Sequence, residues 1–414
     1  MATIQPFEPY RYSATAGDPS RLLTQPYDKI NAETRQRYLA ASPYNLVRLI
    51  LGERRDSDDD SDNVYTRAAQ YLNDWIREGI LAQDAAPGLY AYFQEFTVPD
   101  SGEKLTRKGF IGIGKIEDYS ANVVFRHEQT LTGPKKDRLE LLRHTRAHFG
   151  QIFMLYPDPE GAVDKVLAAA AVEPPVMNVL DEYQARHLLW PITNPVQIAH
   201  VQELMSDKKL LIADGHHRYE TALAYRNEHP GDPAARFVMM TFVNMHSAGV
   251  KILATHRVLR NLEHFDAVHF FEKAANAGWS VAACPTLDAL KQRMAGRDPK
   301  RVQIGVVVAG TEPRLMQRAR KKDEMDVPVL HHDVLGTLLG ISEDAVRDER
   351  YIQYVRGIDA AAAEVRDRGA QVAFLLEPTP IDDMARIAFG GGVMPQKSTD
   401  FYPKLLSGVT IYRL

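Results

Sequence analysis

The sequence has little of what marks several large classes of protein. It holds one cysteine, Cys284, which excludes an internal disulfide framework and a Cys-rich zinc or iron–sulfur site. No apolar run reaches the ~20 residues that cross a bilayer, and the N-terminus lacks the basic-then-apolar pattern of a secretory signal. Lys and Arg number 50 against 54 Asp and Glu, without the basic excess typical of DNA binders. We therefore expect a cytoplasmic protein with no membrane and no nucleic acid among its partners.

Three common motifs are missing as well. There is no Walker A sequence, no G-x-G-x-x-G opening a helix and no G-x-S-x-G. These absences argue against a P-loop, a Rossmann and an α/β-hydrolase protein. What is present is ordinary globular composition, with 45% hydrophobic and 25% charged residues. A chain of 414 residues exceeds what one core usually supports, so we expect more than one domain.

Apolar periodicity predicts a mixed α/β fold along the whole chain. In the N-terminal part we expect helices at 32–41 and 62–79, a buried strand at 45–51, and a hairpin of strands 89–98 and 108–115. Further strands are predicted at 152–156, 209–213, 237–243, 303–308 and 372–377, with a helix at 219–226. We divide the chain into an N-terminal α/β segment at 1–120, a core at 121–260 and a C-terminal α/β segment at 261–414.

An aspartate-rich stretch separates the first strand-like run from the next helix. Its members are Asp56, Asp58, Asp59, Asp60 and Asp62. A calcium-binding EF-hand loop also needs a Gly at its sixth position and a distal Glu, and both are missing here. The pattern is therefore interpreted as a solvated loop.

The most specific pattern lies at 213–219, with the sequence A-D-G-H-H-R-Y, where a predicted strand gives way to a helix. Such a junction exposes backbone N–H groups and the positive end of the helix dipole, which favour an anion. Gly215 permits a sharp turn or a close approach to a ligand, and Arg218 can bind phosphate through two nitrogens. The segment therefore predicts a phosphate site.

Three neighbours of that glycine add chemistry. His216 and His217 can donate to phosphate oxygens or carry protons, and Asp214 can hold a metal ion or orient a histidine. The alternative is a capped helix with two half-buried histidines, but so many polar residues in a row favour a functional site. A zinc-dependent hydrolase is a further alternative, although adjacent histidines face one metal poorly compared with an i,i+4 pair.

A second cluster begins at 126–130, with the sequence R-H-E-Q-T. From 126 to 150 there are six Lys or Arg against three acids, a local positive patch that suits a phosphate-bearing ligand. Glu128 can act as general base for a hydroxyl group. His127, Thr130, Lys135 and Arg138 are candidate phosphate-binding residues. The alternative here is a solvated helix laced with ion pairs.

Two later segments are candidates for substrate binding. His256 and Arg257 follow a strand-like run and can contribute to the same pocket, although for so short a segment a structural role is favoured. The stretch 394–404 carries Lys397 and Lys404 among hydroxyls, aromatics and prolines, so we expect it to be docked, where it can close over a site.

These segments together resemble the DUF1015 family of bacterial and archaeal proteins of unassigned function. The resemblance covers nearly the whole chain. It rests on the segments 25–28 (Q-P-Y-D), 107–110 (R-K-G-F), 127–130 (H-E-Q-T), 137–138 (D-R), 213–219 and 394–404. The family usually has a proline where Gln25 stands.

The D-G-H-H-R element is also similar to the signature of free serine kinases with a ParB/sulfiredoxin-like fold, which phosphorylate L-serine from ADP or ATP. The resemblance implies a ParB/sulfiredoxin-like core with N- and C-terminal elaborations. It gives Glu128 the role of catalytic base and residues 214–218 the nucleotide phosphates, with Asp214 near Mg²⁺. The two motifs lie farther apart here than in the small kinases.

The residues and the resemblance thus both indicate a nucleotide-dependent phosphotransferase acting on a small hydroxylated metabolite, with L-serine as the first candidate. Two alternatives stay open. One is a phosphatase of a phosphorylated hydroxy acid such as phosphoserine. The other is a ParB-like nucleotide-binding regulator without chemistry, although the ParB-like sequence G-E-R-R at 52–55 runs into the aspartate loop and opens no helix.

Overall fold

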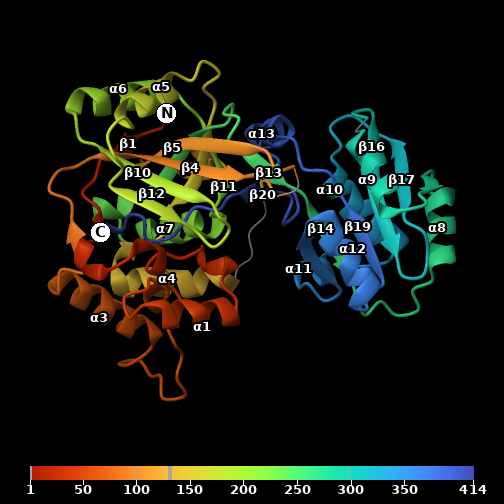
Figure 1. Cartoon of the computed structure of the whole chain (residues 1–414), viewed down its shortest axis with the longest axis horizontal. Helices are drawn as coiled ribbons and strands as arrows, with labels where there is room; N and C mark the ends of the chain where they lie inside the picture. Colours follow the sequence, from red (N-terminus) through yellow and green to blue (C-terminus); the bar gives the residue numbers. More distant parts are fainter. Residues whose placement is uncertain (1, 100, 129–132, 297) are drawn as a thin grey trace. The chain divides into compact units, whose positions relative to one another are not determined.

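The chain folds into two compact units, each described by itself. The computed structural model describes residues 2–99, 101–128, 133–296 and 298–414. Unit 1 comprises Met1–Arg126, Thr130–Lys251 and Tyr402–Leu414, and unit 2 comprises His127–Gln129 and Ile252–Phe401. The chain therefore enters unit 2 twice and returns to unit 1 for its last residues (Figure 1). Unit 1 combines the expected N-terminal segment with most of the expected core.

Unit 1 is built on a mixed nine-stranded sheet in the order β6-β11-β8-β12-β5-β4-β10-β9, with β1 paired to β5. The β11 strand runs parallel to β6 and antiparallel to β8, and β12 runs parallel to β8. The strands are β1 (Ile4–Gln5), β4 (Leu89–Thr97), β5 (Lys104–Lys115), β6 (Val124–Phe125), β8 (Ile152–Tyr156), β9 (Met177–Leu180), β10 (Arg186–Ile192), β11 (Leu210–Asp214) and β12 (Phe237–Asn244).

Helices cover the sheet of unit 1 on both faces (Figure 1). The α5 and α6 helices lie over one face, where the alternate residues Ile152, Met154 and Tyr156 of β8 join the main apolar core. The α1, α3 and α4 helices lie on the other side. The helices are α1 (Ala32–Ala41), α2 (Val47–Ile50), α3 (Val64–Arg77), α4 (Gly133–Thr145), α5 (Ala162–Ala170), α6 (Pro195–Met205) and α7 (His216–Glu228).

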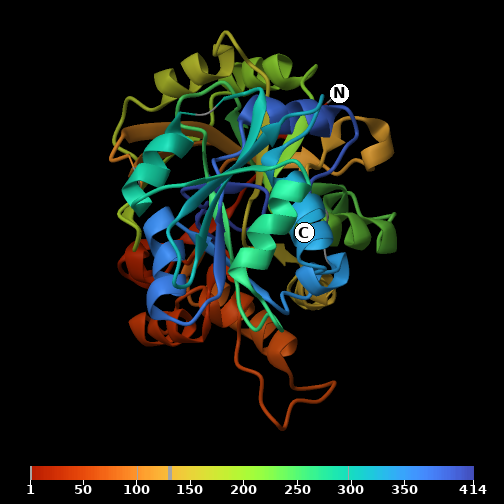
Figure 2. The same cartoon turned by 90° about the vertical axis from the view of Figure 1, so that its right-hand side faces the viewer.

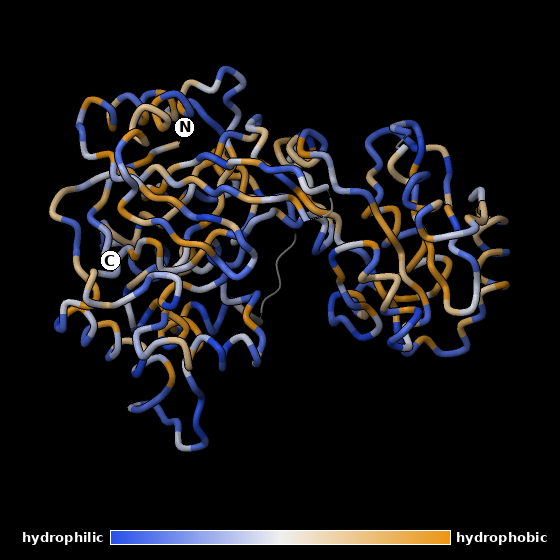
Figure 3. The backbone as a smooth tube through the Cα atoms, viewed as in Figure 1, coloured by the Kyte–Doolittle hydropathy of each residue, from blue (hydrophilic) through white to orange (hydrophobic). Residues whose placement is uncertain are grey.

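The aspartate-rich stretch between α2 and α3 forms a projecting loop, as Figures 1 and 2 show, and Figure 3 shows that it is hydrophilic. Arg67 of α3 pairs with Asp58 and Asp62 across it. The G-E-R-R sequence at 52–55 lies at the start of this loop and opens no helix. The loop interpretation is confirmed.

One predicted strand is wrong. Residues 45–51 were expected to form a buried strand, and residues 47–50 form the short α2 helix. The Asn45 side chain explains this, because its Oδ1 accepts a hydrogen bond from the N–H of Val47 at 2.9 Å while its Nδ2 donates to the carbonyl of Arg21. An Asn side chain that accepts from the backbone N–H two residues on turns the chain away from an extended strand. The N-cap residue of α2 is Leu46, which makes no side-chain cap.

Unit 2 is a six-stranded antiparallel sheet in the order β15-β17-β16-β19-β14-β18. Along β19, Val372 and Phe374 pack in one apolar cluster and Ala373 and Leu375 in another, so both faces of the sheet are buried. The strands are β14 (Thr255–Leu259), β15 (Ser280–Ala283), β16 (Arg301–Val308), β17 (Arg314–Ala319), β18 (Ile352–Arg356) and β19 (Val372–Leu375).

The helices of unit 2 supply the rest of both clusters. Phe270 of α8 and Val334 of a π-helical segment belong to the first, and Leu290 of α9 and Ala361 of α12 to the second. The helices are α8 (Ala267–Asn276), α9 (Leu287–Ala295), α10 (Asp326–Val329), the π-helix (Leu330–Leu338), α11 (Glu343–Arg347), α12 (Ile358–Asp367) and α13 (Ile381–Phe389).

Short strands complete the fold. In unit 1, β2 pairs with β3 and β7 with β21, which fixes the end of the chain to the segment after α4. Within the described part of the chain, no helix is both long and apolar enough to span a membrane. The short strands are β2 (Tyr10–Tyr12), β3 (Leu81–Gln83), β7 (Ala147–His148), β13 (Lys251–Leu253), β20 (Asp400–Tyr402) and β21 (Tyr412–Arg413).

Candidate functional site

The D-G-H-H-R segment forms the junction of β11 and α7 in unit 1, as predicted. The register of β11 against β8 shifts between Ile212 and Asp214, a bulge that re-aims the last side chain of the strand. Gly215 follows as the residue before the helix, with a φ of 92° that L side chains rarely adopt. The strand end, the bulge and the glycine together place the Asp214 carboxylate beside the first turn of α7.

Two cations hold that carboxylate. Arg218 donates through Nη2 to Oδ2 of Asp214 at 2.8 Å, and Lys404 donates through Nζ to Oδ1 at 3.0 Å. Burial raises the pKa of Asp214, but the charges of Lys404 and Arg218 outweigh burial and hold that pKa well below its usual range. The trio therefore keeps two cations and one carboxylate in place at neutral pH, with a net positive charge beside a helix N-terminus.

Close packing fixes Arg218 in this position. Its Nη1 also donates to the carbonyl of Gln151. A Cβ added at Gly150 would lie 3.2 Å from Nη1 of Arg218, and one added at Gly215 would lie 3.0 Å from its Nε. Two glycines thus make room for the guanidinium, which supports a site built around it.

Lys404 is positioned by a buried pair of side chains that lie opposite each other on the neighbouring strands β4 and β5. Arg107 and Gln94 are each about 1% exposed. Arg107 donates to Oε1 of Gln94 and to the carbonyls of Tyr402 and Pro403, and Gln94 donates to the carbonyl of Lys404 at 2.9 Å. Three consecutive carbonyls of the C-terminal segment are therefore fixed to the sheet. This part of the segment is docked, as expected.

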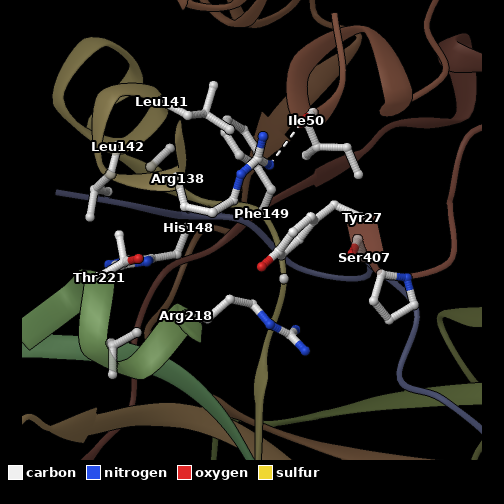
Figure 4. A pocket seen from close by; sticks show the side chains of 14 residues that line it. Tyr27, Ile50, Arg138, Leu141, Leu142, His148, Phe149, Arg218, Thr221 and Ser407 are labelled. Carbon is white, nitrogen blue, oxygen red and sulfur yellow. Dashed lines mark hydrogen bonds between the residues drawn. The ribbon is translucent and has the colours of Figure 1, made fainter. Parts of the chain in front are cut away.

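A cavity of about 70 Å³ adjoins Arg218. Tyr27 of the Q-P-Y-D segment lies in it between Arg138 and Arg218 (Figure 4). The guanidinium carbon of Arg138 is 4.5 Å from the centre of the Tyr27 ring, a cation–π contact, and its Nη1 donates to the carbonyl of Ile50. Burial raises the pKa of Tyr27, while Arg218 and Arg138 lower it, and burial prevails. The tyrosine is therefore a neutral donor at this wall.

The other basic candidate on α4 is differently engaged. Lys135 forms an ion pair with Glu220 of α7, which Arg126 also contacts at 3.5 Å. For Lys135, the structure therefore shows the ion-paired helix that the sequence offered as the alternative to a phosphate site. His216 is buried and His217 half-buried at the start of α7.

The H-E-Q-T segment belongs to unit 2 as far as the structure describes it. Oε1 of Glu128 accepts a hydrogen bond from the N–H of Ser398 at 2.9 Å. The buried His127 ring is hydrogen-bonded through Nε2 to the Thr399 hydroxyl at 2.7 Å. Thr130 lies outside the described residues.

The remaining candidates also lie in unit 2. Arg257 is about 1% exposed and donates to Nε2 of His331 and to the carbonyls of Thr255 and Lys397. Burial lowers the pKa of His256 to about 4, and its Nδ1 accepts from the N–H of Leu376. The Lys397 side chain is exposed. Arg257 and His256 thus have structural partners here, and their predicted part in substrate binding stays a prediction.

Asp214 does not fit a magnesium ligand in this arrangement, because cationic donors hold both of its oxygens. Among the described residues, no group of three or more His, Cys, Asp or Glu side chains is arranged to hold a metal ion. The described side chains therefore do not fit the zinc-hydrolase alternative either.

Comparisons with known proteins can now be set beside this geometry. The family described as "Protein of unknown function (DUF1015)" matches residues 4–335. The chain belongs to this family. A search of curated proteins gives no match to the DUF1015 chain.

Several solved structures share a distant likeness with this DUF1015 protein. A free serine kinase in complex with AMP is 12% identical and covers 67% of this chain and 83% of its own, with a TM-score of 0.37. A conserved hypothetical protein from Pyrococcus furiosus is 12% identical over 70% and 91%, with a TM-score of 0.37. SbnI from Staphylococcus aureus, truncated at its C-terminus, is 10% identical over 72% and 85%, with a TM-score of 0.37.

Sequence reasoning missed several residues of the unit 1 site. Tyr27, Gly150, Gln151 and Ser407 lie at or beside the cavity, and Arg107 fixes the segment that carries Lys404. Tyr27 and Arg107 stand in segments already matched to the family, so that resemblance was the available signal. The other three carry no local pattern and come together only through the fold.

Proposed function

We propose that this DUF1015 protein is a nucleotide-dependent phosphotransferase acting on a small hydroxylated metabolite. One observation carries the proposal: Arg218 and Lys404 are held on Asp214 beside the N-terminus of α7. Phosphoryl transfer depends mostly on positioning and on stabilising negative charge, and fixed cations at a helix N-terminus supply both. L-serine is the first acceptor to test, and ADP and ATP are the first donors, by resemblance of the D-G-H-H-R segment to free serine kinases.

The chemistry assigned to the residues is as follows. Phosphate oxygens of the donor bind the first-turn N–H groups of α7 and the two cations. The acceptor hydroxyl oxygen forms a bond to the transferred phosphorus, the bond from phosphorus to the donor oxygen breaks, and the hydroxyl proton passes to a general base. The base role of Glu128 rests on the resemblance of the H-E motif to the free serine kinases.

The test is phosphorus NMR of the purified protein with ADP or ATP, Mg²⁺ and L-serine or related hydroxy acids. We expect a new phosphomonoester resonance, lost in Glu128→Gln with donor binding kept. Arg218→Ala should weaken donor binding by about tenfold or more, because it removes a charge-assisted contact. Arg226→Ala is the matched control, since it lies two turns along the same helix and pairs with Asp118. Full activity in both site variants would contradict the assignment.

Adding phosphoserine to the same NMR panel separates the alternatives. Release of inorganic phosphate from phosphoserine, without any transfer to L-serine, would indicate a phosphatase. Donor binding without turnover of any acceptor would favour the nucleotide-binding regulator.

A further inference from the structure

The lining of the cavity beside Arg218 indicates which part of the donor nucleotide it binds, an inference that rests on the proposed function. Its walls are mainly apolar, with Ile50, Leu141, Leu142 and Phe149 among them (Figure 4). Among the described residues that line it, none is Asp or Glu. An amino-acid acceptor would leave its ammonium group without a partner here, so this wall composition disfavours the acceptor and suits an uncharged ring.

The size of the cavity indicates which part of a nucleotide it suits. Its volume of about 70 Å³ corresponds to roughly five water molecules, at ~10–15 Å³ of such volume for each. A planar ring fits that space in part, whereas a whole nucleotide does not. Arg218 belongs both to the cavity wall and to the trio with Asp214 and Lys404, so a ligand with its phosphates at the trio has this cavity next to it.

A buried hydroxyl supplies the second observation. Thr221 of α7 lines the cavity, is 5% exposed, and its Oγ1 has no hydrogen-bond partner. Such a group costs free energy unless something pairs with it. His148 lines the same cavity, and burial lowers its pKa to about 4, so its ring is neutral at pH 7 and able both to donate and to accept. Polar edges of this kind match the ring nitrogens of a nucleobase.

We propose that this cavity, walled by Tyr27, Leu142, Phe149 and Thr221, receives the base of the donor nucleotide while its phosphates bind at Arg218 and Lys404. The Thr221 hydroxyl pairs with a polar atom of the base, and the Tyr27 ring and the apolar side chains pack against its faces. The site thus discriminates a nucleotide from a bare polyphosphate.

The test compares ADP with pyrophosphate by calorimetric titration of the full chain. We expect ADP to bind about 10- to 100-fold more tightly than pyrophosphate, because only ADP buries a ring. Thr221→Val keeps the shape and removes the hydroxyl. It should weaken ADP binding by roughly three- to tenfold, the range of one neutral hydrogen bond, and leave pyrophosphate binding unchanged.

Thr241→Val is the matched control. Thr241 of β12 is 1% exposed with an equally unpartnered hydroxyl, and it does not line the cavity. Its variant should bind both ligands like wild type, and a melting curve checks that both variants fold. Equal affinity for ADP and pyrophosphate, or unchanged ADP binding in Thr221→Val, would overturn the inference and leave the phosphate site standing. Failure of the wild type to bind either ligand would instead refute the proposed function on which the inference depends.

Discussion

At Gly215 both the backbone conformation and the neighbouring Arg218 guanidinium exclude a side chain. The φ of 92° disfavours any side chain, and a Cβ would lie 3.1 Å from the central carbon of the Arg218 guanidinium. Glycine is therefore needed here for two reasons: the positive φ of the turn, and the space that Arg218 occupies. Any substitution at Gly215 introduces backbone strain and a clash with Arg218 together. A control at another glycine is therefore needed to measure the strain alone.

Gly215→Ala should cost about 1 kcal/mol through backbone strain and further displace Arg218 from Asp214 and Gln151. Gly278→Ala isolates the first effect, since Gly278 has a φ of 87° at the end of α8 with nothing within 4 Å of the added Cβ. Chemical unfolding and ADP titration of both variants provide the measurement. We expect similar strain in both and weaker ADP binding in Gly215→Ala alone. Equal ADP affinities would show that the contact with Arg218 is unimportant.

Among the elements, the β11–α7 junction was predictable and α2 was not. The run at 209–213 is apolar and ends at a polar residue followed by glycine, which marks a strand end wherever it occurs. The run at 45–51 is also apolar, and runs this short fit a buried strand or a buried helical turn equally well. Asn45 was the signal that distinguished them, because an Asn side chain that bonds the backbone N–H two residues on favours a turn over a strand.

The phosphate trio was predictable in part, for a related reason. Asp214, Gly215 and Arg218 lie within five consecutive residues, so their proximity follows from the sequence. Lys404 reaches them from nearly two hundred residues away in the sequence, and Arg107 fixes it through backbone carbonyls that no side-chain pattern reveals. Contacts to the main chain leave no signature in a single sequence.

The C-terminal segment at 402–406 forms a strap that Arg107 and Gln94 hold to the sheet through three backbone carbonyls. Arg107→Lys supplies a point charge that cannot serve Gln94 and two carbonyls at once. Leaving buried acceptors without donors should cost about 1–3 kcal/mol, speed hydrogen exchange at 402–406 and weaken ADP binding. Exchange measured by mass spectrometry checks this.

Arg320→Lys is the control for that experiment. Arg320 likewise donates to three carbonyls, those of Pro299, Arg301 and Glu324. Its loss should leave exchange at 402–406 unchanged. Slow exchange there in Arg107→Lys would show that other contacts hold the strap.

For the whole molecule, buried histidines make stability depend on pH. Burial, with Arg257 adding repulsion, lowers the pKa of His331 to about 3 and that of His256 to about 4. The unfolded chain therefore binds more protons than the folded one below about pH 6.5, so the free energy of unfolding falls as pH falls through that range.

His331→Gln should reduce this dependence. Between pH 6.5 and 5.5 each such histidine accounts for about 1 kcal/mol, and the variant should lose that much less stability than wild type across the interval. Urea unfolding at the two pH values measures the difference. His200→Gln, at a side chain 54% exposed, should behave as wild type. A slope unchanged in His331→Gln would show that this group is not neutral in the folded protein.

The return of the chain to unit 1 at residue 402 sets a condition on its biosynthesis. The ribosome makes all of unit 2 before it makes the strap, so Arg107 and Asp214 wait through the whole of that interval without their acceptors or their lysine. A nascent chain released early contains the D-G-H-H-R turn and lacks Lys404. In such a product Asp214 keeps Arg218 as a partner and lacks the second cation, so the arrangement of charges at the start of α7 is incomplete.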